Sequence, residues 1–156
     1  MSRWKSWNDN SNGIAAVTAI VGLFVSAAGF WFGYHQLQET SRALQSSNSY
    51  SIQKDARDLN EKLQAAGSID KLVSGQIAAD DKVRAYHDLW TMFNFYLSVF
   101  RQQQADGVPD SFAKSFSDDF CGFVRNPPIS AAWDEMVKRK LIGVPYINMR
   151  TQWCSA

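Results

Sequence analysis

Charge is missing from one part of this 156-residue chain. Residues 14–34 contain no Asp, Glu, Lys, Arg or His, so every charged side chain lies outside this segment. The 16 Lys and Arg and the 15 Asp and Glu leave a formal net charge of +1. A balance so near zero gives no sign of the basic surface that binds nucleic acid. We therefore expect no nucleic-acid partner.

The chain also has few residues that hold metals or cofactors. It has two His and two Cys, and no two of these residues have the close spacing of zinc ligands. These residues are His35, His87, Cys121 and Cys154. The nine glycines are isolated and form no phosphate-binding loop. We expect neither a metal nor a cofactor.

Patterns typical of catalytic sites are sparse as well. Ser111 and Lys114 have the Ser-x-x-Lys spacing of some acyl-transfer enzymes, but the companion motifs of those enzymes are missing. Ser68 and Lys71 repeat the spacing in the same chain, which shows how readily it arises by chance. We predict no catalytic residue. The alternative is an enzyme anchored at a membrane.

The uncharged segment has the length of a membrane helix. The 21 residues of segment 14–34 form a helix of about 31 Å at about 1.5 Å per residue, close to the roughly 30 Å hydrocarbon core of a bilayer. A secretory signal peptide is the alternative, because residues 26–28 resemble a cleavage site. The apolar sequence continues through Trp31 and Tyr34, where a mature chain would already have begun. We predict an uncleaved transmembrane helix over 14–34 after an N-terminal tail over 1–13.

Small residues recur within this segment at steps of four and three. This spacing places them along one face of a helix, which we call the small-residue stripe. Membrane helices pack through close backbone approach over such residues, so we predict that the stripe contacts another transmembrane helix. The predicted interface residues are Ala15, Ala19, Gly22, Ser26, Gly29 and Gly33.

Basic residues on the two sides of the segment give its predicted orientation. Arg3 and Lys5 precede it, whereas Arg42 is the only Lys or Arg in the first 15 residues after it. Positive charge favours the cytoplasmic side, so we expect the N-terminus in the cytoplasm.

The rest of the chain predicts helices. Residues 35–66 favour a juxtamembrane helical stalk, with a bend over 46–51 because Ser and Asn side chains bond their own backbone. Residues 68–156 predict a helical domain, since no stretch alternates with a period of two residues. The fold class is therefore all-α, a transmembrane helix and stalk followed by a small bundle of about four helices.

The helices of this bundle are marked by capping residues and apolar spacing. The expected helices begin at Ser68, Asp80, Asp110 and Ser130. The longest apolar stripe lies in residues 83–100 and predicts the core helix, with Trp90 buried in it.

Two interpretations of the cysteines stay open. Cys121 and Cys154 are 33 positions apart and would pair if the domain faces an oxidising compartment. The alternative is two reduced thiols, with Cys121 buried among phenylalanines.

Four features carry a resemblance. They are a single N-terminal anchor, a Gln-rich juxtamembrane helix, the aromatic sequence over 87–96, and the sequence from Pro127 to Trp133. In this order they resemble small, uncharacterised bacterial single-pass membrane proteins. The resemblance implies a bacterial inner-membrane protein with a helical domain, and it implies no catalytic residue.

These observations favour a structural or interaction role. We predict a single-pass membrane protein whose partners are membrane lipid and other transmembrane helices. In one form it is an accessory subunit of a larger membrane complex. In the other it is a self-associating protein of envelope or phage-defence function.

Overall fold

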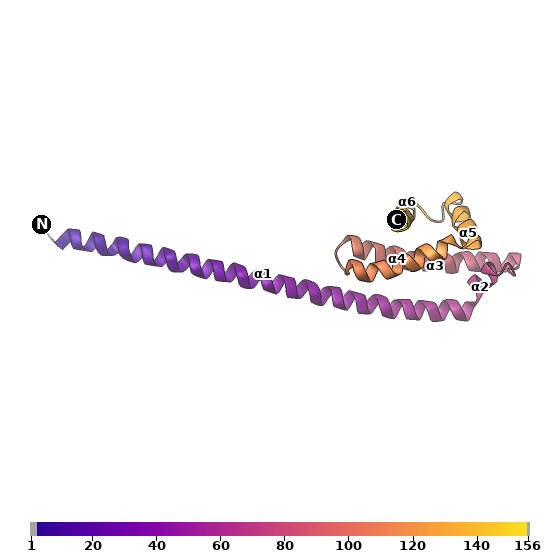
Figure 1. Ribbon diagram of the computed structural model, residues 1–156, viewed down its shortest axis with the longest axis horizontal. Coiled ribbons are helices and arrows are strands. Elements are labelled where there is room, and N and C mark those ends of the chain that lie inside the picture. Colours follow the sequence, from indigo (N-terminus) through magenta and orange to yellow (C-terminus); the bar gives the residue numbers. More distant parts are fainter. Residues whose placement is uncertain (1–2, 156) are drawn as a thin grey trace. The chain divides into compact units, whose positions relative to one another are not determined.

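The structure is a computed structural model that describes the backbone of residues 3–155 and the side chains of residues 18–155. Over this part of the chain all regular structure is helical, in six helices without a strand (Figure 1). The prediction of an all-α fold is confirmed. The chain forms two compact units, one up to Ala43 and one from Leu44 onward. Each unit is described by itself.

The first helix, α1 (Arg3–Ala66), contains the apolar segment and the predicted stalk. Residues 46–51, where the sequence favours a bend, lie inside this helix. Two polar side chains here find partners beyond their own turn, because Gln45 and Asn48 donate to the carbonyls of Asp106 and Gly107, each at 3.0 Å. Ser49 donates to the carbonyl of Gln45 within the helix at 2.7 Å. These hydrogen bonds attach α1 to the turn between α3 and α4, and α1 stays helical over residues 46–51.

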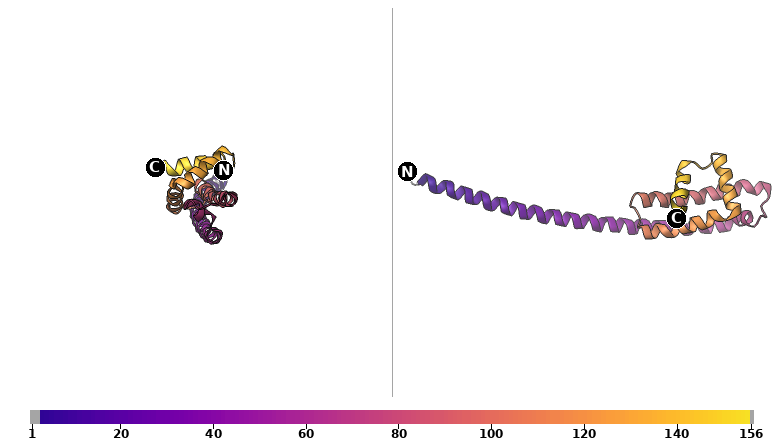
Figure 2. Two further views of the ribbon diagram at one scale, coloured as in Figure 1. Left: turned by 90° about the vertical axis from the view of Figure 1, so that its right-hand side faces the viewer. Right: turned by 45° about the horizontal axis from the view of Figure 1, so that its top comes forward.

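Five further helices follow α1 in the second unit. They are α2 (Ser68–Val73), α3 (Ala79–Gln104), α4 (Asp110–Arg125), α5 (Pro127–Lys138) and α6 (Val144–Cys154). Figures 1 and 2 show α3 and α4 side by side, with α5 and α6 packed against them. The sequence predicted about four helices here, and α6 is the additional one.

The start of α5 also differs from the prediction. The sequence favoured Ser130 as the first residue, but the helix begins at Pro127. Proline is well suited to the first helical turn, because its fixed φ matches the helix and no donor is needed there. The same applies to α6, which begins directly after Gly143 and carries Pro145 in its first turn.

The core of the second unit is aromatic. Phe93 is fully buried, and its ring meets the ring of Trp133 edge-on, with the ring centroids 4.8 Å apart. The ring of Phe120 meets the ring of Phe93 edge-on at 6.2 Å and lies 5.9 Å from that of Trp133. Edge-to-face contacts of this kind add to the stability that apolar burial provides. Residues from α3, α4 and α5 thus close a single core.

The buried face of α3 includes Phe93, Leu97 and Phe100 of the predicted stripe but leaves two of its residues exposed. Leu89 is fully buried, but Trp90 is 41% exposed and Val83 is 77% exposed. The prediction of Trp90 as a core residue is wrong. The helix packs with its Leu89, Phe93 and Leu97 side inward, because α4 and α5 cover that side, and the Trp90 side borders an open groove.

A second, smaller cluster joins the end of α1 to the domain. Ile52 is 8% exposed and packs in a cluster with Val99, Val108 and Ala113. All side chains of residues 53–66 are exposed or half-buried.

Candidate functional site

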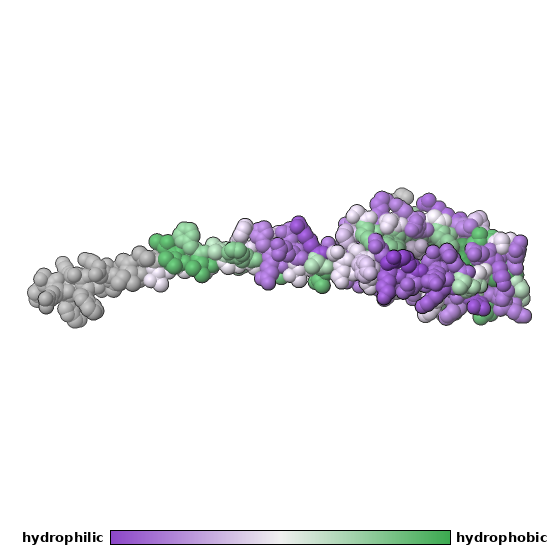
Figure 3. Space-filling model, turned by 90° about the horizontal axis from the view of Figure 1, so that it is seen from below, coloured by the Kyte–Doolittle hydropathy of each residue, from purple (hydrophilic) through white to green (hydrophobic). Residues whose placement is uncertain are grey.

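The apolar part of α1 exposes large side chains along its length. Ile20 is 54% exposed, Phe24 74% and Phe30 85%. Figure 3 shows these apolar residues gathered in one band, followed by polar side chains further along the helix. Within residues 18–155, α1 is the one helix that is long and apolar enough to cross a membrane, a criterion that a signal sequence also meets.

The small-residue stripe lies in the same segment. A Cβ atom added to Gly22, Gly29 or Gly33 meets no other atom within 4 Å, so the space beside these glycines is open. Ala19 and Ser26 are exposed as well. The side chain of Ala15 lies outside the residues whose side chains are described. The partner helix stays a prediction.

Aromatic side chains gather where the apolar segment ends. The rings of Trp31 and His35 lie 4.4 Å apart between centroids, and Phe32 and Tyr34 contact the same pair. Aromatic rings with a polar edge are typical of the boundary between bilayer and water. Trp31, Tyr34 and His35 all belong to this cluster.

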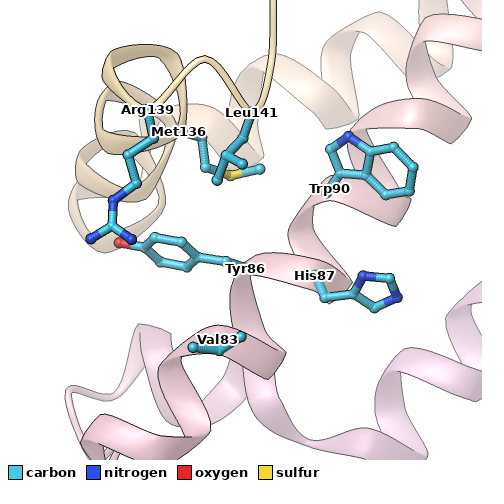
Figure 4. A pocket seen from close by; sticks show the side chains of 7 residues that line it. All are labelled: Val83, Tyr86, His87, Trp90, Met136, Arg139 and Leu141. Atoms are coloured by element: carbon cyan, nitrogen blue, oxygen red, sulfur yellow. The ribbon is translucent and has the colours of Figure 1, made fainter.

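A groove opens between α3 and the end of α5 in the second unit. Its volume is about 380 Å³. Figure 4 shows the side chains from α3 on one wall and those from α5 and the following turn on the other. The lining residues are Val83, Tyr86, His87, Trp90, Met136, Arg139 and Leu141.

A turn shapes the α5 side of this groove. Lys140 has a φ of 60°, and its amide donates to the carbonyl of Val137 at 3.0 Å. The amide of Leu141 donates to the carbonyl of Met136 at 2.9 Å. This pair of bonds is the Schellman ending of a helix, in which the left-handed residue is usually glycine. The turn brings Leu141 back beside Met136, and both line the groove.

Charged side chains converge on Glu135 at the polar end of the groove. Lys82 lies 3.3 Å from the Glu135 carboxylate, and Arg139 forms an ion pair with the same group. The hydroxyl of Tyr86 donates a hydrogen bond to it. That hydrogen bond, followed by the one from Lys82, lowers the pKa of Glu135 below its ordinary value. Glu135 in turn raises the pKa of Lys82, mainly through the same hydrogen bond.

Two cysteines come together on the far side of the core. Cys121 of α4 and Cys154 of α6 form a disulfide, with their Cα atoms 5.5 Å apart. Of the two interpretations left open by the sequence, the structure has the paired form. Cys121 is 6% exposed and belongs to the main core. It is therefore buried, as the reduced-thiol interpretation expected, although it is disulfide-bonded.

The candidate catalytic and metal residues are not brought together. Lys114 pairs with Asp118 at 3.3 Å on the surface of α4, and the nearby Ser111 is exposed. His87 stacks on Trp90 with the ring centroids 6.1 Å apart. Across residues 18–155, no three His, Cys, Asp or Glu side chains lie together as a group that could hold a metal ion.

Sequence reasoning missed the groove as a site. Its lining residues Val83, Tyr86 and Trp90 belong to the apolar stripe of residues 83–100 that was assigned to the core. Spacing places residues on one face of a helix but does not tell whether a neighbour covers that face. The signal that could have found the turn is the sequence Gly143, Val144, Pro145, which marks a new helix start close after α5.

In comparisons with known proteins, no family model, no curated protein and no solved structure matches this chain.

Proposed function

We propose that this chain is a single-pass membrane protein with a structural role, which packs through the small-residue stripe of α1 against a helix of a larger membrane complex. The observation that carries the proposal is the exposure of large apolar side chains over an uncharged segment of α1. Burial of such side chains is strongly favourable, at about 1.5 to 3 kcal/mol for each large apolar group. A bilayer would bury all of them at once.

The stripe supports a helix partner within the membrane. Gly22 and Gly29 leave open space on one side of the helix, where a second backbone could come close. The larger side chains Phe24 and Trp31 lie on the opposite side and would face lipid. In lipid the hydrophobic effect does not drive helices together. Close packing of this kind drives their association instead.

The disulfide supports an orientation for the proposed protein. Disulfides form and persist in oxidising compartments and are rare in the cytosol. A domain closed by Cys121 and Cys154 would therefore lie outside the cytoplasm. Arg3 and Lys5, before the apolar segment, favour the cytoplasm for the N-terminus. Both arguments give the same orientation, which protease digestion of the domain from one side of sealed vesicles would test.

The test of the helix partner replaces Gly22 and Gly29 together with Leu. A Cβ atom at either position meets no other atom within 4 Å, and Leu is a good helix former, so α1 itself should tolerate both changes. Membrane insertion should be kept, because Leu is at least as favourable in a bilayer as Gly. The bound partner should be lost from the particle purified in mild detergent, as measured by native gel and by mass.

A matched control is the double replacement of Ala27 and Ala28 with Leu. Both residues are exposed and lie away from the stripe, so Leu side chains of the same size are added on other faces of the helix. This variant should keep its partner. Equal retention in both variants would refute the stripe as an interface. A parent particle made only of copies of this chain would favour the self-associating form.

A further inference from the structure

The groove between α3 and α5 has one apolar region and one polar end. Val83 is 77% exposed and Leu141 49% exposed, although both are large apolar side chains, and the fully buried Met136 closes the floor. Trp90 borders the groove with 41% of its surface exposed. A volume of about 380 Å³ lies in the range of small-molecule sites, toward its lower end. One extended apolar chain suits this space better than two.

The polar end carries an excess of positive charge. Lys82 and Arg139 share the single carboxylate of Glu135, so two cations face one anion. Lys138 and Lys140 flank Arg139 in sequence and have exposed side chains, and the nearby carboxylate of Asp134 has its own cation, Arg150, at 3.8 Å. Among the groups at this end, a further anion would be attracted rather than repelled. Charge complementarity therefore favours an anionic group at the Arg139 end of the groove.

The turn beside Arg139 sets the positions of two groove residues. Lys140 holds a left-handed backbone conformation, which costs an L-residue about 1 to 2 kcal/mol where glycine would cost nothing. Here the strained residue is a cation, and it separates the two groove residues Arg139 and Leu141.

We propose that this groove binds a single-chain anionic amphiphile such as a long-chain carboxylate. The chain would lie along Val83, Met136 and Leu141, with the indole of Trp90 at its side. The carboxylate would bind the guanidinium of Arg139, whose planar donors match a carboxylate with two parallel hydrogen bonds. The site is separate from the small-residue stripe, so its test does not depend on the proposed membrane partner.

The test uses the full chain labelled with ¹³C at the methionine methyl groups and held in phosphatidylcholine nanodiscs. Dodecanoate is the probe, and the methyl signal of Met136 is the reporter. We expect a saturable shift of this signal, while the signal of Met92, which does not line the groove, stays in place. A Met136→Leu variant assigns the reporter. Partition of dodecanoate into the nanodisc alone would produce no saturable shift at Met136.

Four comparisons make the result specific. Dodecanol has a similar chain without the charge and should bind about tenfold more weakly, as should dodecanoate to Arg139→Gln, because each loses a charge-assisted hydrogen bond. The matched control Arg101→Gln removes an exposed base from the other end of α3 and should bind as the parent does. Val83→Asp should abolish binding, and since Val83 is largely exposed this variant keeps its fold.

Four results would overturn the proposal. They are the absence of a saturable Met136 shift, equal affinity for dodecanol and dodecanoate, unchanged binding in Val83→Asp, and a Met136 shift that follows protein concentration without any probe. The last result would identify the groove as a contact between two copies of the chain.

Discussion

Replacement of Phe93 with Ala tests which side of α3 forms the core. Phe93 is fully buried and its ring contacts the rings of Phe120, Phe123 and Trp133. Phe→Ala changes at such positions cost about 3 to 5 kcal/mol, from lost burial and from the cavity left behind. We expect a loss of stability in this range for Phe93→Ala.

Trp90→Ala is the matched comparison on the same helix. Trp90 is a larger residue, but it is 41% exposed and borders the groove. Its removal should cost about 1 to 2 kcal/mol, because part of its surface already contacts water. The sequence alone predicts Trp90 as a core residue, whose loss would cost about 3 to 5 kcal/mol.

Urea denaturation of the full chain in detergent micelles, followed by near-ultraviolet circular dichroism, measures both variants. The part of this signal that comes from the packed rings of the core, such as Phe93, Phe120 and Trp133, is lost when the domain unfolds. With a slope of about 1 to 3 kcal/mol per M urea, a loss of 3 kcal/mol lowers the midpoint by at least about 1 M. The reasoning is refuted if Trp90→Ala lowers the midpoint as much as Phe93→Ala does.

Three further predictions concern the turn, the carboxylate and the disulfide. Lys140→Gly should raise the free energy of unfolding by about 1 kcal/mol in the same assay, because glycine adopts the left-handed conformation without strain. A loss of stability would show that backbone strain at Lys140 does not destabilise the folded domain. The lowered pKa of Glu135 means that its contribution to stability is complete above the ordinary carboxyl pKa of 4.5 and is lost as the pH falls below it, through the lowered value in the folded state. Unfolding of Glu135→Gln followed from pH 6 to pH 3 should therefore show a shallower loss on the acid side than the parent, and parallel curves would contradict the assignment. Joint replacement of Cys121 and Cys154 by Ala should cost about 3 to 4 kcal/mol for a loop closed over 33 positions, and intact-mass measurement with thiol blocking should find no free thiol in the unreduced parent.

The sequence predicted the helices whose signals are local. The ends of α3 and α4 follow from the turn residues after Gln104 and from the Asn126, Pro127, Pro128 sequence, and both helices lie where the spacing predicts them. The start at Ser68 also agrees with α2. These features depend on backbone chemistry within a few residues, which the sequence contains directly.

Features set by distant neighbours were not predictable in the same way. The apolar residues of α3 cover a wide arc, and only the positions of α4 and α5 decide that Leu89 is buried while Val83 is exposed. The helix α6 buries one residue, Met149, so it lacks the apolar stripe by which helices are recognised in a sequence. The polar residues near position 48 favour a turn in isolation, but here they bond carbonyls about 60 positions away. The candidate groove exists only because α3 and α5 pack together in this way, whereas the small-residue stripe follows from residue spacing alone.

The sparse burial of residues 53–66 has a consequence for the dynamics of the domain. This last part of α1 is attached through Ile52 and the hydrogen bonds of Gln45 and Asn48, while the main core forms among the other helices. Segments with few buried apolar contacts open with a smaller free energy than the global unfolding. Amide hydrogens of residues 53–66 should therefore exchange with solvent through local opening, well before those around Phe93. The aromatic core would stay closed during such openings, so this helix end can detach and return without unfolding the domain.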